Sequence, residues 1–143
     1  MAERPDAVQT ALRALRSRDR TAAELDARLR ERGVAEQERQ DALEALARAG
    51  YVDDERVAVG RAAALAARGS GDALIRDDLE RRGLPAELVQ AALAGLEPER
   101  LRAEAVVSRR GIGPKTARYL AARGFAGDVV AAAVAQEGSR ALE

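Results

Sequence analysis

The chain of 143 residues contains neither cysteine nor histidine. The absence of cysteine excludes disulfide bonds, thiolate nucleophiles and metal sites built on cysteine. The absence of histidine removes the commonest metal ligand and the commonest general base. Only 2% of the residues are aromatic, so the core has to be built from alanine, leucine and valine. Alanine and leucine favour tightly packed helices, whereas strands favour β-branched and aromatic residues.

The sequence also lacks a net charge, because its 24 basic residues are balanced by 24 acidic ones. A neutral balance gives no general attraction for nucleic acid. No segment resembles a signal peptide or an apolar run long enough to span a bilayer. We therefore expect a cytoplasmic protein with no membrane partner.

One pattern occurs three times along the chain. Gly33, Gly83 and Gly124 each follow an arginine and precede an apolar residue, and a leucine lies four residues before each glycine. The glycines are 50 and 41 residues apart, a spacing typical of stacked helical repeats. Each glycine is suited to closing a helix in the left-handed conformation. Such arrays usually bind another macromolecule over an extended surface.

Helix start and stop residues divide the chain into nine helices, in three sets of three, with no strand. Thr21 to Glu24 has the form of a capping box, and Asp53 and Asp54 can accept hydrogen bonds from first-turn amides. The four prolines, including Pro5, stand where helices are expected to begin. We predict an all-α fold, with a ninth helix that ends near Gly138.

This division of the chain predicts four segments. They are a first helical repeat over residues 5–52, a second over 53–96, a third over 97–137, and a C-terminal tail over 138–143. Two aromatic residues that flank turns, Tyr51 and Phe125, are predicted to anchor the packing between repeats.

Two pairs of adjacent carboxylates are the only candidates for acid–base chemistry. They are Asp53 with Asp54 and Asp77 with Asp78, and adjacent residues on a helix point in different directions. We interpret the first pair as a helix cap and the second as part of a solvated face. No third ligand or phosphate-cradling loop accompanies either pair. We predict no catalytic residue, no metal site and no cofactor, and hence a protein that is not an enzyme.

Positive charge is concentrated in the third repeat. All five charged residues between Val106 and Phe125 are basic, and such a patch can meet nucleic acid or an acidic protein surface. The candidate contact residues of this patch are Arg109, Arg110, Lys115, Arg118 and Arg123. Further candidates elsewhere are Arg16, Arg18, Arg81 and Arg82.

The segment GIGPKTARYL, residues 111–120, offers an alternative function. It resembles the hairpin of helix-hairpin-helix DNA-binding modules, in which glycine amides and a helix N-terminus contact a phosphate. That hairpin needs an apolar residue directly before its first glycine, and Arg110 stands there instead. The segment is also in register with the other two repeats. We favour a linker between helices and keep an autonomous DNA-binding module as the alternative.

Several longer runs are similar to the RecX family of bacterial recombination regulators, over roughly residues 7 to 137. The runs are TAAELDARLRERG, ALARAGYVDDERVA, IRDDLERRGL and RYLAARGFAGDVV. The resemblance implies three tandem three-helix repeats in an elongated, curved molecule. It also implies a protein that needs no cofactor.

The same resemblance implies a partner, the RecA filament on single-stranded DNA. Proteins of this family typically limit the ATPase, strand-exchange and co-protease activities of RecA. Family members are often basic, whereas this chain is neutral, so any direct binding to DNA is expected to be weak. We expect a monomer.

Overall fold

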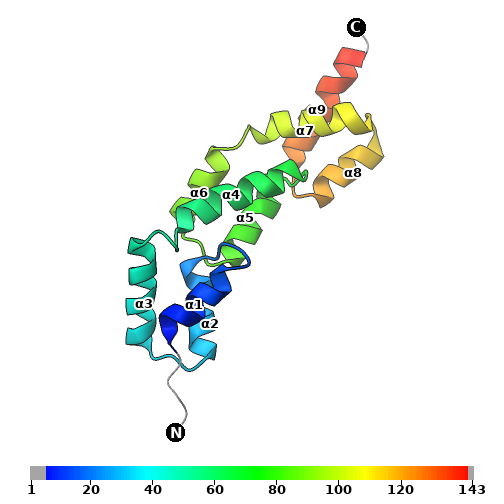
Figure 1. Ribbon diagram of the computed structural model, residues 1–143. Coiled ribbons are helices and arrows are strands. Elements are labelled where there is room, and N and C mark those ends of the chain that lie inside the picture. The colour runs from blue at the N-terminus through cyan, green and yellow to red at the C-terminus, as the bar shows by residue number, and fades with distance from the viewer. Residues whose placement is uncertain (1–5, 142–143) are drawn as a thin grey trace.

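The computed structural model describes residues 6–141, with side chains through Gln136. Over this range the chain forms nine α-helices and no strand, which confirms the all-α prediction. The helices are α1 (Ala7–Leu15), α2 (Ala22–Glu31), α3 (Glu36–Arg48), α4 (Asp54–Ala67), α5 (Asp72–Arg81), α6 (Ala86–Ala94), α7 (Glu99–Arg110), α8 (Pro114–Ala122) and α9 (Gly127–Ala141). They form an elongated, bent molecule with α1–α3 at one end and α7–α9 at the other (Figure 1).

Consecutive helices pack in sets of three, and each set encloses its own apolar core. The leucine that precedes each repeat glycine lies at the centre of its set. Leu29, Leu79 and Leu120 are all fully buried. Burial of one such side chain stabilises the fold by about 1.5–3 kcal/mol. The repeated leucine is therefore a core position in each set of helices.

Most of the local predictions hold. The capping box of α2 is formed, with Glu24 N donating to Thr21 Oγ1 at 3.0 Å and Thr21 N donating to Glu24 Oε1 at 3.1 Å. The three repeat glycines have φ angles of 79°, 79° and 89°, as left-handed helix ends require. Pro5 lies outside the described residues.

Two of the expectations are wrong. α9 continues to Ala141, past Gly138, because a glycine weakens a helix by about 1 kcal/mol without having to end it. Tyr51 is not a packing anchor, since 55% of it is exposed. Phe125 is 5% exposed; it packs in the apolar core of the third set and also lines a hollow shared with α4 of the second set.

The sets are joined through their middle helices, which meet end to end. The C-terminal end of α8 rests on the N-terminal end of α5, and the C-terminal end of α5 rests on that of α2 (Figure 1). At the two contacts, Arg123 O accepts a hydrogen bond from Gly71 N at 2.8 Å, and Arg82 O accepts one from Thr21 Oγ1 at 2.6 Å. The negative end of one helix dipole thus faces the positive end of the next.

Glycine is required at these contacts because a side chain would collide there. A Cβ atom on Gly83 would lie 2.5 Å from Ala23 Cβ, and one on Gly124 would lie 2.7 Å from Leu74. At the free end of α2, by contrast, a Cβ on Gly33 would meet nothing within 4 Å. Two of the three Arg-Gly steps therefore join neighbouring sets, and the first is the open end of the row.

A carboxylate from the following set completes each contact. Asp54, the first residue of α4, accepts a hydrogen bond from Ala22 N at 2.8 Å. Glu99, the first residue of α7, accepts one from Asp72 N at 3.2 Å. Both amides belong to the first residue of a middle helix, where no intrahelical partner exists. α8 begins with Pro114, which has no amide hydrogen, so it needs no such carboxylate.

An ion-pair network reinforces the contact between α5 and α2. Asp78 accepts two hydrogen bonds from Arg61, at 3.0 Å each, and one from Arg82 at 3.0 Å. Arg82 also reaches Glu24 at 3.6 Å. The expectation that Asp77 and Asp78 form a solvated face is thus wrong for Asp78, whose side chain is 20% exposed. Arg61 of α4 and Arg82 at the end of α5 enclose it, which the order of residues along α5 does not reveal.

The substitution Gly83→Ala should destabilise the protein more than Gly33→Ala. Both residues have a φ of 79°, so an alanine at either position costs about 1–2 kcal/mol in backbone strain. At Gly83 the added Cβ also collides with α2, which adds about 1–3 kcal/mol. Urea unfolding followed by circular dichroism measures the free energy of unfolding of both variants. Equal losses would show that the helix ends are not in close contact.

The substitution Asp78→Asn should lower the free energy of unfolding by about 1–3 kcal/mol, as expected for lost hydrogen bonds to charged groups. Asp77→Asn is the matched control. The pair of Asp77 with Arg81 is exposed, so its loss should change the stability by less than about 1 kcal/mol.

The stability that Asp78 contributes to the fold should depend on pH. Hydrogen bonds from Arg61, and then from Arg82, hold the pKa of Asp78 below its ordinary value of 3.8. A lowered carboxyl pKa contributes stability above the ordinary value and loses it as the pH falls through the lowered one. The difference between the wild type and Asp78→Asn should therefore be constant near neutral pH and shrink below about pH 4. A difference that grows in acid would contradict the network.

Candidate functional site

A cluster of arginines lies where the second and third sets of helices meet. Arg68 follows the last turn of α4, Arg109 and Arg110 end α7, and Arg123 follows α8. Arg68, Arg109 and Arg110 line one hollow of about 300 Å³ together with Tyr119. Arg123 joins them by donating from Nη2 to Arg68 O at 2.8 Å. We call these four arginines the junction cluster.

Arg110 and Arg123 of the junction cluster are placed by local contacts. The guanidinium of Arg110 lies over the ring of Tyr119, 3.7 Å from its centroid, a favourable cation–π contact. Arg123 points at the carbonyl end of α4, where a helix dipole favours positive charge. Its Nε atom is buried and has no hydrogen-bond partner among the described residues. The side chains of Arg110 and Arg123 are thus held in place without a carboxylate partner.

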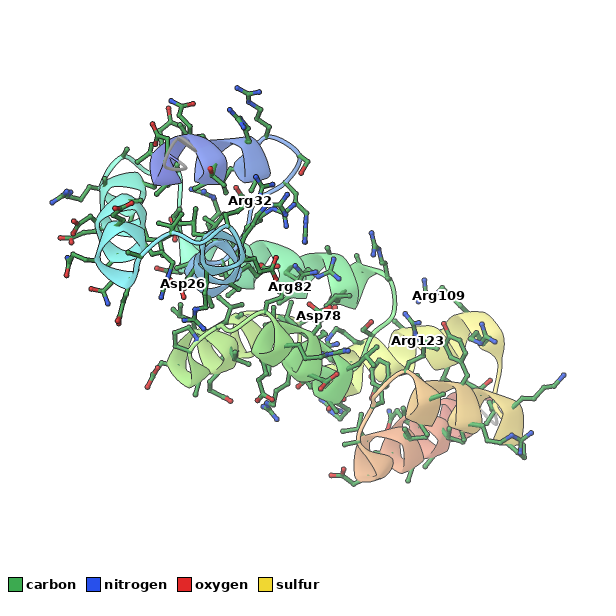
Figure 2. The ribbon with its side chains drawn as sticks, turned by 90° about the horizontal axis from the view of Figure 1, so that it is seen from below. Asp26, Arg32, Asp78, Arg82, Arg109 and Arg123 are labelled. Carbon is green, nitrogen blue, oxygen red and sulfur yellow. The ribbon has the colours of Figure 1, made fainter. Side chains whose placement is uncertain are left out.

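The absence of acidic partners distinguishes this cluster from the contact between α5 and α2. Over the described residues, Arg68, Arg109, Arg110 and Arg123 form no salt bridge. At the other contact the arginines are ion-paired, because Arg61 and Arg82 pair with Asp78 and Arg18 pairs with Glu24 at 3.6 Å. Figure 2 shows Arg82 beside Asp78 in the middle of the molecule and Arg109 near Arg123 in its last third.

The nine candidate residues from the sequence do not form a single patch. Arg109, Arg110 and Arg123 come together in the junction cluster. Lys115 and Arg118 are exposed on α8 and make no hydrogen bond or ion pair with a described residue of that cluster. The structure thus brings together three of the five basic residues of the third repeat, and it leaves Lys115 and Arg118 outside the cluster on α8.

The candidates outside the third repeat lie in two other places. Arg18, Arg81 and Arg82 line a cleft of about 270 Å³ with Glu24 and Asp78. Arg81 is paired with Asp77 at 2.6 Å. Arg16 is exposed beside Leu12, Leu15 and Tyr51, which line a separate hollow.

Sequence reasoning missed two features of these surfaces. Arg68 was not a candidate, although Arg68-Gly69 is a further Arg-Gly step at the end of a helix and could have been found from that pattern. Arg20 was likewise not a contact candidate, although it belongs to one basic stretch of the sequence with Arg16 and Arg18. Burial lowers the pKa of Arg20, and the nearby charges of Arg18, Arg28 and Arg82 lower it further. Arginine nevertheless remains protonated, and the nearby charge of Glu24 favours its charged form.

The acidic side chains of the described residues form no group of three or more that could hold a metal ion. None of the described helices is long and apolar enough to cross a membrane. The junction cluster can bind anionic groups, because each arginine presents several hydrogen-bond donors in a fixed plane.

Known proteins resemble the chain in sequence. Comparison with models of protein families gives no match. The regulatory protein RecX of Trichlorobacter lovleyi is 35% identical over 142 residues, which cover 87% of this chain and 91% of the relative. The regulatory protein RecX of Chromohalobacter salexigens is 38% identical over 124 residues, covering 80% and 82%.

Solved structures show the same fold. A crystal structure of RecX from Lactobacillus salivarius has a TM-score of 0.77 at 18% identity, covering 91% of this chain and 93% of that one. A second crystal structure of a regulatory protein RecX has a TM-score of 0.69 at 20% identity, covering 86% and 67%. Because relatives named regulatory protein RecX match most of the chain at 35% and 38% identity, this chain belongs to the RecX family of regulatory proteins.

Proposed function

We propose that this protein regulates RecA by binding along the RecA filament on single-stranded DNA. The observation that carries the proposal is the junction cluster, four arginines without a carboxylate partner on an elongated array of the RecX family. An extended partner suits an array whose three sets of helices lie in a row (Figure 1). The junction cluster would face an acidic RecA surface or the DNA in the filament.

The mechanism follows from linking three weak contacts in one chain. Each set of helices contributes a modest contact, and the first contact raises the effective concentration of the others. A molecule that bridges neighbouring RecA subunits holds them in one arrangement. Such bridging opposes the subunit movements of the ATPase cycle and the growth of the filament end. We therefore propose that the effect on RecA is inhibitory.

The second candidate function is autonomous binding to DNA through residues 111–120. Gly111 and Gly113 have φ angles of 89° and 138°, and Ile112 at the tip of the turn is 49% exposed. Thr116 Oγ1 donates to Gly111 O at 2.7 Å and so closes the turn. Over the described residues, no side chain caps the first amides of α8. Binding to bare DNA with a steep dependence on salt would favour this function.

The double substitution of Arg109→Ala and Arg110→Ala should weaken the inhibition of RecA. The loss of two arginine contacts to an anionic surface, at about 1 kcal/mol each, raises the half-inhibitory concentration roughly tenfold or more. The measurement is RecA-dependent ATP hydrolysis on single-stranded DNA at increasing concentrations of the protein. A second pair, Lys115→Ala with Arg118→Ala, tests whether the contact extends along α8.

The matched control is Arg30→Ala with Arg48→Ala, on α2 and α3. These arginines are exposed and pair only within their own helices, so their loss should leave inhibition unchanged. Circular dichroism establishes that each variant is folded. Inhibition that is equal in the wild type and in the folded Arg109 and Arg110 variant would reject the proposed placement. A wild type that leaves ATP hydrolysis unchanged would reject regulation of RecA itself.

A further inference from the structure

The junction cluster borders a longer groove that runs between α4 and α7. A second hollow, of about 390 Å³, shares Gly69, Val106 and Arg109 with the hollow that holds the cluster. Its other walls are mainly apolar, with Ala63 and Ala66 of α4, Ala105 of α7, Leu96 and Phe125. We call these two adjoining hollows the groove: its first half is mainly apolar, its second half is cationic, and Arg109 lines both.

We propose that this groove binds a segment of a partner protein in which a large apolar side chain stands next to carboxylates. The apolar side chain would fill the half lined by alanine and leucine, and the carboxylates would meet Arg68, Arg109 and Arg110. The identification of the partner as RecA rests on the proposed function. The chemistry of the segment does not depend on it.

The charges of the groove favour carboxylates as ligands. Arg68, Arg109 and Arg110 are exposed and have no acidic partner among the described residues. Arg102, which also lines the groove, is neutralised by Asp72. Glu97 lines the apolar half and forms no salt bridge with any of these arginines. An arginine can bind a carboxylate through two parallel hydrogen bonds, which fixes the direction of the bound segment.

The apolar half of the groove argues against a nucleic acid in this place. A chain of phosphates and sugars gains little from an apolar wall, whereas an apolar side chain gains about 25 cal/mol for each Å² that it removes from water. Single strands usually bind by stacking their bases on aromatic rings. The ring of Tyr119 is covered by Arg110 at 3.7 Å, and Phe125 is 5% exposed. The groove thus lacks a free ring on which a base could stack.

Titration of the ¹⁵N-labelled full chain, followed by NMR, tests the proposal without RecA. The first probe is a ten-residue peptide with one central leucine flanked by aspartates, and the second is an oligothymidine of equal charge. We expect the peptide to shift the amide signals of Gly69, Ala105 and Arg109, and the oligothymidine to leave them in place. Shifts caused by the oligothymidine alone, or by neither probe, would overturn the proposal.

Two substitutions separate the halves of the groove. Ala105→Trp fills the apolar half and leaves every charge in place, so it should weaken binding of the peptide about tenfold or more. Arg109→Gln should weaken it by a similar factor and should not respond to added salt as strongly as the wild type does. The control is Ala91→Trp, because Ala91 is an exposed residue of α6 outside the groove.

A last comparison separates this proposal from the proposed function. If the peptide binds in the groove but the protein does not change ATP hydrolysis by RecA, the groove is correct and RecA is not the partner. If RecA is inhibited equally by the wild type and by Ala105→Trp, and the peptide shifts no groove signal, the regulation of RecA stands and the groove has another role. A peptide in which lysines replace the aspartates should not bind, and its binding would contradict the role of the arginines.

Discussion

The end-to-end contact between the middle helices is the constraint on which the rest of the molecule depends. The helix that ends at Gly83 can rest on α2 only because that residue has no side chain, and the same is true of Gly124 on α5. Asp54 and Glu99 then satisfy the first amides of the two receiving helices. These contacts fix the direction of the row, so three small cores become one elongated body.

The same contacts decide which arginines are available to a partner. Arg82 and Arg123 occupy equivalent positions before their glycines, yet their surroundings differ. Arg82 lies between Asp78 and Glu24 and forms ion pairs with both, so its charge is neutralised within the molecule. Arg123 meets a carbonyl group of α4 instead, and no acidic side chain of the described part of the chain pairs with it. The two junctions are built alike but differ in charge: the arginine of one is paired with carboxylates, and the arginine of the other is not.

This difference explains how a neutral chain can have a cationic binding surface. The formal charge of zero hides a balanced first half and an unbalanced last third. Ion pairs remove most of the positive charge from the contact between α5 and α2, whereas the junction cluster keeps it. The apolar half of the groove, beside that cluster, adds a preference for ligands that carry an apolar group next to their negative charge.

The nine helices follow from local features of the chain, because caps, glycines and apolar spacing act within a few residues. Thr21, Gly83 and Leu79 act as their sequence positions predict. The order of the repeats and the excess of arginine around Arg109 also follow from the sequence. Only the tertiary structure decided that Asp78 is enclosed, that Tyr51 is exposed, and that Arg68 joins the cluster. Those outcomes depend on which helix ends meet in space, and residues far apart in the chain make those contacts.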